Sequence, residues 1–471
     1  MLTPEQIPEV FAAQQAARWR IAESSAEARI TRLLRLKEAI VARRDALAAA
    51  VHADFRKHAT EFELTELFPT LAEIDHAAEH LEAWMDPEKV RTPLVLTGTR
   101  SEVRREPRGV VLILAPWNYP FFLLVGPLVA AIAAGNVAIL KPSNKTPHMA
   151  AALAELIAAV FPADEVALFT GSGELGDRLL ELPFDHFFFT GGAAVGRKVM
   201  LAAARHLAPV TLELGGKSPA IVDASADVVA SARRLVWGKF INAGQTCVAP
   251  DYALVHRSQY DAFLAAAVAA IEAAYGATPA ARKASPDLAR LVDDRALARL
   301  RQTLGRTLET GARLVIGGEH DAAERYLAPT IIADVAPDAP IMADEIFGPI
   351  LPVLRFDALD EAVALIRGKD RPLALYIFAE DRARVEQVLA QTSAGGTVVN
   401  NAILHLANPN LPFGGVGASG MGSYHGRWGF EEFSHARAVL TQRGGALARF
   451  FYPPYDTTRS KLAARGLRAL E

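Results

Sequence analysis

The fold is decided by one uncharged stretch, Gly109-Val-Val-Leu-Ile-Leu-Ala-Pro-Trp-Asn-Tyr-Pro-Phe-Phe-Leu-Leu-Val-Gly-Pro-Leu-Val-Ala-Ala-Ile-Ala-Ala-Gly-Asn-Val-Ala-Ile-Leu140. This run is longer than the roughly 20 apolar residues that a membrane-spanning helix needs. It is interrupted, however, by Pro116, Pro120 and Pro127 and by the turn pair Gly135-Asn136. These breaks exclude one continuous helix through a bilayer.

The pieces between the breaks are short apolar elements. Residues 110–114 are too short for anything but a buried strand, 121–134 predict a buried helix, and 137–140 predict a second strand. Near-continuous apolar strands are typical of a parallel sheet that is covered on both faces. We therefore predict a buried βαβ unit.

The same alternation continues along the chain. Strands and helices that take turns predict a doubly wound parallel sheet, whose ligands bind at the carboxyl ends of the strands. For this first unit we predict strands at 109–114, 137–141, 166–170, 186–190 and 209–214, and helices at 121–134, 147–160, 174–182 and 193–206. For a second α/β unit we predict helices at 225–241, 258–275, 288–310, 358–368 and 381–391, and strands at 252–256, 312–316, 326–335, 350–355, 373–378 and 396–400.

The remaining segments have other patterns. Helical spacing is present in 14–53 and 61–84, and weak alternation in 94–104 predicts an exposed hairpin. Residues 408–429 are rich in glycine and predict an ordered loop. The run His76-Ala-Ala-Glu79-His80 matches the H-x-x-E-H pattern of a zinc protease class. No other feature supports such a protease, so we interpret it as a surface helix and predict no metal site.

The composition is that of a soluble globular protein. Hydrophobic residues make up 51% and charged residues 22% of the 471-residue chain, enough to build more than one core. The net charge of -3 is unlike that of a nucleic-acid binder. A single cysteine fits a reducing compartment, and no signal-peptide pattern is visible at the start. We expect a cytoplasmic protein with no integral membrane segment.

The single cysteine, Cys247, lies in Asn242-Ala-Gly-Gln-Thr-Cys247. A lone free cysteine is most often an inert buried side chain, and the alternative is a nucleophile. Small and polar residues precede Cys247, with no apolar period that would place it in a core. This stretch alone leaves both interpretations open.

Two features suggest a dinucleotide site. Gly191, Gly192 and Gly196 end a predicted strand and open a helix, an arrangement that presents backbone N–H groups to a pyrophosphate. Their spacing is not G-x-G-x-x-G, so a plain β–α turn is an equal alternative. Lys141 follows the second strand, where a ribose would be recognised, although a lysine at a strand end is usually just solvated.

Two further polar residues follow predicted strands. Glu213 ends an apolar strand, where partial burial would raise its pKa toward that of a general base; the alternative is a solvated glutamate. Asn118 lies between two prolines, so its amide could act as a rigid oxyanion donor or merely bond its own turn. The convergence of residues 118, 141, 213 and 247 at strand ends favours one catalytic site.

These residues belong to a series of motifs through which the chain resembles an aldehyde dehydrogenase over nearly its whole length. The motifs are Pro116-Trp-Asn-Tyr-Pro120, Lys141-Pro-Ser143, Phe189-Thr-Gly191 with Gly196, Leu212-Glu-Leu-Gly-Gly-Lys217, Gly244-Gln-Thr-Cys247, Glu345-Ile-Phe-Gly-Pro349 and Leu411-Pro-Phe-Gly-Gly415. Within the superfamily it most resembles the class-three branch, which includes fatty, aromatic and coniferyl aldehyde dehydrogenases. The pointers are a start without a long arm and the runs 419–426, 433–435 and 452–455.

The resemblance implies oxidation of an aldehyde to the acid with NAD or NADP. Cys247 would form a thiohemiacetal and then a thioester, Asn118 would hold the oxyanion, and Glu213 would activate the hydrolytic water. The implied cofactor contacts are Lys141, Ser143, Asn144, Gly191, Gly192, Gly196, Leu214, Gly215, Glu345 and Phe347. The apolar residues expected near the substrate are Tyr119, Phe121 and Phe413, which suit a medium-chain aliphatic or an aromatic aldehyde.

Two departures from the family pattern concern the cofactor. Asn144 stands where many relatives have a glutamate that repels a 2′-phosphate, and Lys145 adds a cation beside it. We therefore predict that NADP⁺ is accepted. Gly192 replaces a common serine, which costs a hydroxyl but keeps the turn.

The resemblance also divides the chain into two α/β domains and a small β element. We expect a dinucleotide-binding domain at 1–91 and 107–214, a catalytic domain at 215–393, a bridging and oligomerisation element at 92–106 and 394–445, and a basic tail at 446–471. A homodimer is typical of this branch. The alternatives are a CoA-acylating relative, which does not need Glu213, and a catalytically dead descendant, which should have lost Cys247 or Glu213.

Overall fold

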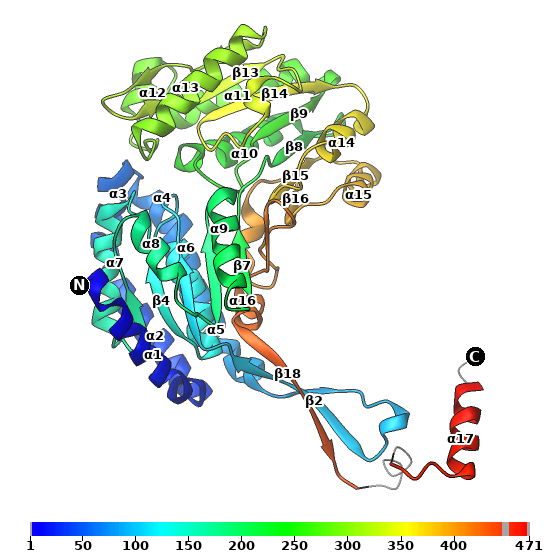
Figure 1. Cartoon of the computed structure of the whole chain (residues 1–471). Helices are drawn as coiled ribbons and strands as arrows, with labels where there is room; N and C mark the ends of the chain where they lie inside the picture. Colours follow the sequence, from blue (N-terminus) through cyan, green and yellow to red (C-terminus); the bar gives the residue numbers. More distant parts are fainter. Residues whose placement is uncertain (1, 445–451, 469–471) are drawn as a thin grey trace.

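The computed structural model describes residues 2–444 and 452–468. Figure 1 shows two bodies, each built on a sheet with helices on both sides, and a long antiparallel ribbon that projects away from them. The mixed α/β architecture confirms the predicted fold class.

The first body is built on a six-stranded sheet in the order β17-β7-β6-β3-β4-β5. All neighbours pair in parallel except β17, which is antiparallel to β7. Its central strand, β3, runs from Val110 to Leu114. The chain adds β4 and β5 on one side of β3 and β6 and β7 on the other, so the strand order reverses beside β3. The other strands are β4 (Val137–Lys141), β5 (Val166–Leu168), β6 (His186–Thr190), β7 (Val210–Glu213) and β17 (Gly420–Met421).

Side chains of β3 alternate between two hydrophobic cores, as the period of a strand requires. Val111 and Ile113 belong to the core that α5, α6 and α7 cover, whereas Val110, Leu112 and Leu114 belong to the core that α1, α8 and α9 cover. Both faces are therefore buried, which is why the strand is apolar at every position. The helices are α1 (Ile7–Ala22), α5 (Phe68–Met85), α6 (Phe122–Ala134), α7 (Pro147–Val160), α8 (Gly173–Leu180) and α9 (Ala193–Ala204).

The helical N-terminal region is more divided than its composition indicates. The helical pattern predicted over 14–53 is divided after α1, because Ser25 is the N-cap of a new helix, α2. Its side chain accepts a hydrogen bond from the Ala28 N–H. A five-residue π-helical segment precedes α5, and no sequence signal predicted it. The elements are η1 (Pro4–Gln6), α2 (Ala26–Ala42), α3 (Arg44–Phe55), α4 (Ala59–Phe62) and the π-helix η2 (Glu63–Leu67).

The second body is built on a seven-stranded sheet in the order β10-β13-β14-β9-β8-β15-β16. The interior strand β8 (Pro219–Val222) was missed by the sequence prediction, and the helix expected over 288–310 begins only at Asp294. The other strands are β9 (Tyr252–His256), β10 (Arg313–Ile316), β13 (Thr330–Ala333), β14 (Ile350–Phe356), β15 (Ala374–Phe378) and β16 (Gly396–Val399), and β11 (His320–Asp321) pairs with β12 (Tyr326–Leu327) beside them. The helices are α10 (Val228–Phe240), α11 (Tyr260–Tyr275), α12 (Pro279–Ala284), α13 (Asp294–Glu309), α14 (Leu359–Arg367) and α15 (Arg382–Gln391), with short η4 (Ile241–Gly244), η5 (Arg257–Gln259) and η6 (Pro340–Met342).

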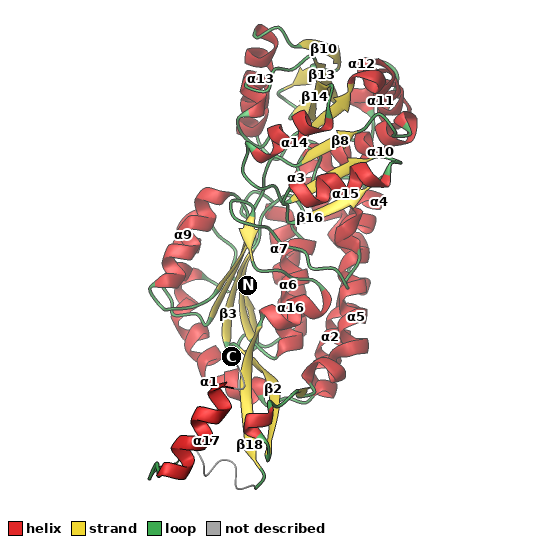
Figure 2. Cartoon of the chain, turned by 90° about the vertical axis from the view of Figure 1, so that its right-hand side faces the viewer, coloured by secondary structure: helices red, strands yellow, loops and turns green. Residues whose placement is uncertain are grey.

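The projecting ribbon is a three-stranded sheet, β1-β2-β18. Figure 2 shows β2 and β18 extending beyond the two bodies. The strand expected within 94–104 is β2 (Thr99–Pro107), which pairs with the much shorter β1 (Glu88–Val90) and along its length with β18 (Ser434–Gln442). Residues Leu94–Leu96 are a 3-10 turn, η3, rather than part of a hairpin strand.

Two expected boundaries differ from the structure. The element predicted over 394–445 is not one unit, because β16 pairs with β15 in the seven-stranded sheet and β17 joins the six-stranded one. Residues 408–429, predicted to be a loop, contain β17 and the start of α16 (Gly426–Glu432). In the predicted tail, α17 (Thr457–Arg468) is described, whereas 446–451 and 469–471 lie outside the described residues.

Candidate active site

Cys247 lies where two cavities of different character meet. The larger one, of about 690 Å³, has a mainly apolar wall, and the smaller one, of about 220 Å³, lies against the carboxyl ends of the six-stranded sheet. Among the described residues, Cys247 is the only one that belongs to both walls. A thiol at this junction can meet reactants from both sides.

The Cys247 loop leaves α10 through three successive residues with left-handed backbone, Asn242 (φ 52°), Ala243 (φ 53°) and Gly244 (φ 73°). A side chain at Gly244 could not be accommodated, because its Cβ would lie 2.3 Å from the carbonyl oxygen of Gly348. Glycine therefore allows the loop to touch the Glu345–Gly348 segment. This contact brings Cys247 and Phe347 to one cavity.

Buried amide side chains fix the shape of this loop. Gln245 is fully buried and donates from Nε2 to the carbonyl oxygens of Asn242 and Arg290, both at 3.0 Å. Its Oε1 accepts from the Val292 N–H at 2.9 Å. The glutamine before Thr246 and Cys247 is thus a structural residue that holds the loop to the second body.

Asn118 comes from the loop after β3 and points its amide at the same segment. Its Nδ2 donates to the carbonyl oxygen of Gln245 at 3.0 Å, and the residue is 3% exposed. An amide nitrogen carries two hydrogens, so one N–H remains for a ligand beside Cys247. The amide of Asn118 is therefore next to the loop that carries Cys247.

Glu213 is the last residue of β7. It lies opposite Thr190 on β6 and Gly420 on β17, and its carbonyl oxygen accepts from the Gly191 N–H at 2.9 Å. Both carboxylate oxygens are buried without a hydrogen-bond partner in the described protein. Burial, with a smaller contribution from Glu432, holds the pKa of Glu213 well above its usual range.

The electrostatics of the resting site favour neutral groups. Burial raises the pKa of the Cys247 thiol to about 12, and the Glu345 and Glu213 carboxylates act in the same direction. The backbone N–H groups of Cys247 and Val248 oppose this shift by favouring the thiolate. Burial, followed by Asp251, raises the pKa of Glu345 to about 8. Burial thus favours the neutral form of each of these groups.

The small cavity brings together most of the residues expected at the cofactor. A Cβ at Gly215 would lie 2.1 Å from Oε2 of Glu345, so this glycine leaves room for the carboxylate. A Cβ at Gly192 would meet nothing within 4 Å. The wall contains Pro116, Trp117, Asn118, Thr190, Gly191, Gly192, Glu213, Leu214, Gly215, Cys247, Glu345 and Phe347.

The glycine turn fits the pyrophosphate of a dinucleotide. Gly192 is the N-cap of the 12-residue helix α9, and no side chain occupies the cap position. No side chain caps the N–H groups that begin α9, and a helix N-terminus of this kind favours an anion. Gly196 has another role, because its Cβ would lie 2.8 Å from Leu214 Cδ2, so it permits close packing of α9 on the site.

Other expected cofactor residues lie outside the small cavity. The Lys141 Nζ donates to the carbonyl oxygen of Pro142 at 3.2 Å, and burial lowers its pKa. The Ser143 Oγ accepts from the Lys145 N–H at 3.2 Å, and Asn144 is exposed. Lys145, expected to add a cation beside Asn144, pairs with Asp293 at 2.7 Å. The positive charge available to a 2′-phosphate is therefore partly neutralised.

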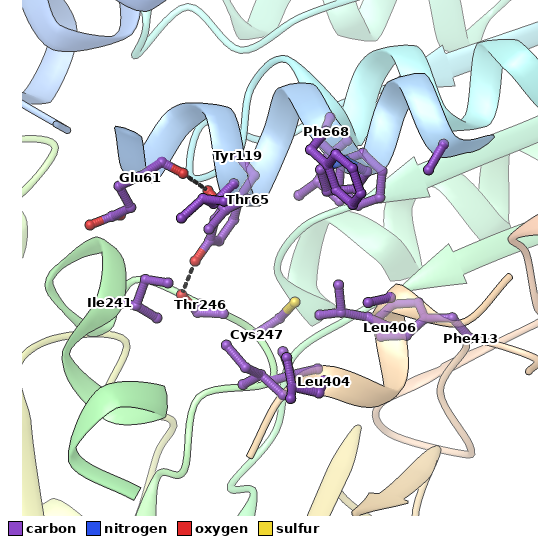
Figure 3. Close-up of a pocket in the computed structure, with 18 of the residues that line it drawn as sticks. Glu61, Thr65, Phe68, Tyr119, Ile241, Thr246, Cys247, Leu404, Leu406 and Phe413 are labelled. Atoms are coloured by element: carbon purple, nitrogen blue, oxygen red, sulfur yellow. Dashed lines mark hydrogen bonds between the residues drawn. The ribbon is translucent and has the colours of Figure 1, made fainter. Parts of the chain in front are cut away.

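The large cavity is lined by two of the three expected substrate residues. Tyr119 and Phe413 are in its wall, and Figure 3 shows Tyr119 reaching toward Thr246 while the Cys247 sulfur points into the pocket. Phe121 was assigned to this wall incorrectly: it is fully buried, and its ring packs on Phe62. Its neighbour Phe122 lines the cavity instead, because α6 starts at Phe122 and turns successive side chains in different directions.

Most of the remaining wall was not predicted. It comes from α4, η2 and α5, from the 3-10 turn η7 (Leu404–Ala407) and from the segment before α16. Its apolar members are Leu64, Phe68, Pro69, Ala72, Phe122, Leu123, Trp237, Ile241, Val248, Ile403, Leu404, Leu406, Ala407 and Pro409. Two of these wall residues could have been found from the sequence, because Phe122 follows the predicted Phe121 and Thr246 precedes Cys247. The wall residues on α4, η2 and α5 have no sequence feature that marks them.

The family is shown by comparison with known proteins, because the model of the aldehyde dehydrogenase family matches residues 1–439. The chain belongs to the aldehyde dehydrogenase family. This dehydrogenase is 44% identical over 423 residues to the 4,4'-diaponeurosporen-aldehyde dehydrogenase of Staphylococcus aureus, covering 90% of this chain and 91% of the relative. It is 42% identical over 446 residues to human aldehyde dehydrogenase family 3 member B1, covering 94% of each chain. The similarity to a family 3 member confirms the predicted branch.

Solved structures agree with this assignment. The substrate-bound state of Staphylococcus aureus AldH superposes with a TM-score of 0.93 at 41% identity and covers 97% of this chain and 99% of that one. The Mycobacterium tuberculosis aldehyde dehydrogenase complexed with NAD⁺ gives 0.86 at 31% identity, covering 95% and 92%. The glyceraldehyde-3-phosphate dehydrogenase GapN of Methanocaldococcus jannaschii, complexed with NADP, gives 0.85 at 25% identity, covering 94% and 95%. The aldehyde dehydrogenase described here is an NAD(P)-dependent enzyme that oxidises an aldehyde to the acid.

Two further observations concern metals and membranes. His76 and His80 lie on α5 with their rings 4.3 Å apart, and His80 stacks on Trp84. Within residues 2–444 and 452–468, no group of three His, Cys, Asp or Glu side chains is placed to hold a metal ion. In the same ranges, no helix combines the length and the apolar character that crossing a bilayer requires.

Proposed function

We propose that this enzyme oxidises a medium- or long-chain apolar aldehyde, or an aromatic one, through a covalent intermediate on Cys247. The observation that carries the proposal is the position of Cys247 between a large apolar cavity and a smaller cavity that contains Glu213 and Asn118. An apolar aldehyde can reach the thiol from the first cavity while the other reacting groups act from the second.

The first step is attack of the Cys247 sulfur on the aldehyde carbon. The thiol gives up its proton to the solvent, and its sulfur forms a bond to the carbonyl carbon. The carbonyl oxygen becomes an oxyanion, which the free N–H of Asn118 Nδ2 and the Cys247 backbone N–H stabilise. The hydrogen bond from Asn118 to Gln245 keeps the amide in place during this step.

The second stage forms and hydrolyses a thioester. Collapse of the oxyanion expels the hydride from the former aldehyde carbon and leaves an acyl group on the sulfur. When bound, NAD⁺ or NADP⁺ supplies the acceptor for that hydride and a positive charge. Glu213 then takes a proton from a water that attacks the thioester, and the thiolate leaves with release of the acid. The unpartnered carboxylate oxygens of Glu213 support this role.

The residues proposed to hold the cofactor come from three segments. The N–H groups at the start of α9, with Gly191 and Gly192, would hold the pyrophosphate. Glu345 would bond ribose hydroxyls and Phe347 would orient the nicotinamide. Lys141, Ser143 and Asn144 would meet the adenosine ribose. Since Asn144 carries no negative charge, we propose that both NAD⁺ and NADP⁺ are accepted.

The proposed substrate class follows from the wall of the large cavity. A volume of about 690 Å³ lies in the range of pockets that enclose whole ligands. Its mouth includes exposed apolar residues, Phe68 (67%), Leu64 (66%) and Leu404 (48%), which would contact a chain that extends outward. The relative named for 4,4'-diaponeurosporen-aldehyde supports a large apolar substrate.

We also propose a homodimer in the cytoplasm. The ribbon of β1, β2 and β18 projects from the bodies and offers an edge for a second subunit (Figure 1). A free nucleophilic thiol is retained in a reducing compartment. Analytical ultracentrifugation of the full chain would test the dimer, and a purely monomeric species would contradict it.

The decisive experiment follows NAD(P)H absorbance with benzaldehyde, hexanal and coniferaldehyde. Wild type is expected to turn over at least one of them, and Cys247→Ala none. Glu213→Gln should form NAD(P)H in a single burst, and mass spectrometry should find the acyl group on Cys247. Turnover by the alanine variant would refute the covalent mechanism. Unimpaired steady-state turnover by Glu213→Gln would refute the proposed base.

A further inference from the structure

A fully buried ion pair lies beneath the loop that carries Asn118. The Lys57 Nζ is 2.6 Å from Oε1 of Glu66, and both side chains are 0% exposed. Removing two charges from water is costly, and a buried pair is often no more stable than apolar residues of the same size. The contacts that this pair makes are therefore more informative about its role than its contribution to stability.

The pair holds the Asn118 loop at both ends. Lys57 donates from Nζ to the carbonyl oxygen of Asn118 at 3.3 Å and lies 4.1 Å from the ring centroid of Tyr119. Glu66 accepts at Oε2 from the backbone N–H groups of Phe121 at 3.0 Å and Phe122 at 3.4 Å. Helix α6 starts there without a capping side chain of its own, so the Glu66 carboxylate satisfies its free N–H groups. The charge pair thus spans residues 118–122.

Local backbone structure places both charges. Lys57 follows Arg56, the C-cap of α3, whose backbone is left-handed at φ 58°. Glu66 lies in the π-helical segment η2, where one turn is wider than in an α-helix. Such segments are rare and occur frequently at functional sites. The irregular turn directs Glu66 inward, beneath α6.

The same region also holds the nucleophile loop. Oε1 of Glu61 accepts from the Asn242 N–H at 2.9 Å, and Asn242 Nδ2 donates to the Asn118 carbonyl oxygen at 2.8 Å. That oxygen therefore receives hydrogen bonds from both Lys57 and Asn242. Figure 3 shows Glu61 and Thr65 on one side of the pocket and Tyr119 extending from there to Thr246, next to Cys247. Residues 57–66 connect the oxyanion loop and the nucleophile loop.

We propose that the Lys57–Glu66 ion pair is a positioning device that fixes the Asn118 amide relative to Cys247. It contacts neither substrate nor cofactor and acts through the backbone of residues 118–122. This inference rests on the oxyanion role proposed above for Asn118. Since a misplacement of about 1 Å at a reacting centre can reduce a rate about a hundredfold, loss of either charge should reduce kcat far more than it changes KM.

The test compares kcat and KM of Lys57→Met, Glu66→Gln and the double variant with hexanal. We expect kcat to fall roughly tenfold to a hundredfold in each single variant, with the KM values of aldehyde and cofactor changed less than about threefold. The double variant buries no unpaired charge, so it should unfold near the wild-type temperature and still be slow. If it is stable and fully active, the proposal is wrong.

Arg29→Met is the matched control, because Arg29 is a buried cation on α2 that contacts the C-terminal end of α6, opposite the end that Glu66 contacts. It is 3% exposed and donates from Nη1 to the carbonyl oxygen of Ala133 at 3.0 Å. We expect this variant to be less thermostable but to keep its kcat within about twofold of wild type, since α6 is still held at its start. A loss of kcat as large as that of Lys57→Met would assign the effect to general destabilisation and overturn the proposal.

Combining Lys57→Met with Asn118→Ala distinguishes a failure of the positioning role from a failure of the oxyanion role on which it rests. If Lys57 acts through Asn118, Lys57→Met should have little further effect on kcat in the Asn118→Ala background. Multiplicative losses would show that Lys57 acts elsewhere and would overturn the positioning role. If Asn118→Ala itself leaves kcat unchanged, the oxyanion role is wrong, and the positioning proposal fails with it.

Discussion

The substitution Asp293→Asn is expected to raise the preference for NADP⁺ over NAD⁺. Asp293 neutralises Lys145 through a 2.7 Å ion pair, and its Oδ1 caps α13 by accepting from the Ala296 N–H at 2.8 Å. Asparagine caps a helix as well as aspartate does. The substitution therefore removes the charge that faces Lys145 and keeps the helix start.

The size of the effect follows from the exposure of the pair. The side chains of Lys145 and Asp293 are 46% and 31% exposed, and ion pairs in such surroundings contribute about 0.2–1 kcal/mol. A freed lysine gains about 1 kcal/mol with a unit charge 4 Å away in water. The ratio of kcat/KM for NADP⁺ to that for NAD⁺ should therefore rise about twofold to fivefold at low salt, and less at high salt because the interaction is screened.

The assay is NAD(P)H absorbance with one aldehyde and each cofactor in turn. Lys145→Met is expected to lower the ratio, and Asp293→Asn should have no effect on it when Lys145 is already absent. An unchanged or lower ratio in Asp293→Asn would refute the reasoning. So would an increase that persists in the Lys145→Met background, because the cation would then play no part.

Three further outcomes are expected. In wild type, Glu213 has a raised pKa in the folded state, so its contribution to stability is fully present at low pH and is lost as pH rises above the ordinary glutamate pKa. The melting temperature of Glu213→Gln minus that of wild type should therefore increase between pH 5 and 9. A difference that stays constant with pH would contradict a buried carboxylate. Phe68→Ala should reduce kcat/KM for dodecanal about fourfold or more, because apolar contact is lost, and should leave kcat/KM for propanal unchanged. The control is Trp19→Ala, which removes an equally exposed side chain outside the cavity wall and should change neither value. Tyr119→Phe removes the 2.6 Å hydrogen bond to the buried Thr246 hydroxyl and should lower the free energy of unfolding, measured by urea titration, by about 1–3 kcal/mol. Addition of Thr246→Val should restore part of this free energy, because no buried hydroxyl is then left unpaired.

The strands of the first sheet other than β17 could be predicted because each is a short apolar run between breaks. Strand β8 escaped prediction since it has only four residues, starts at a proline and follows a loop of small residues. It nevertheless lies in the interior of its sheet, and both of its faces are buried through contacts with chain segments far away in sequence. Such burial cannot be read from four residues.

The catalytic candidates at strand ends could be predicted because parallel strands end at one edge of a sheet. The roles of Lys57 and Glu66 could not be predicted, because nothing in a helical segment with many charges indicates which two of them pair. Nor does it indicate that the pair contacts the distant loop that carries Asn118. The error at Phe121 has a related cause. Two adjacent phenylalanines at a helix start point in different directions, and only the packing against Phe62 determines which one is buried.

The meeting of the two cavities at a single side chain has a consequence for how this enzyme can change. The residues proposed to recognise the aldehyde and those proposed to surround the hydride acceptor form separate sets that share only Cys247 among the described residues. Substitutions at Phe68, Leu404 or Phe413 can therefore remodel one set while the other stays as it is. Substrate range can thus be altered at these side chains without replacing any residue in the wall of the small cavity.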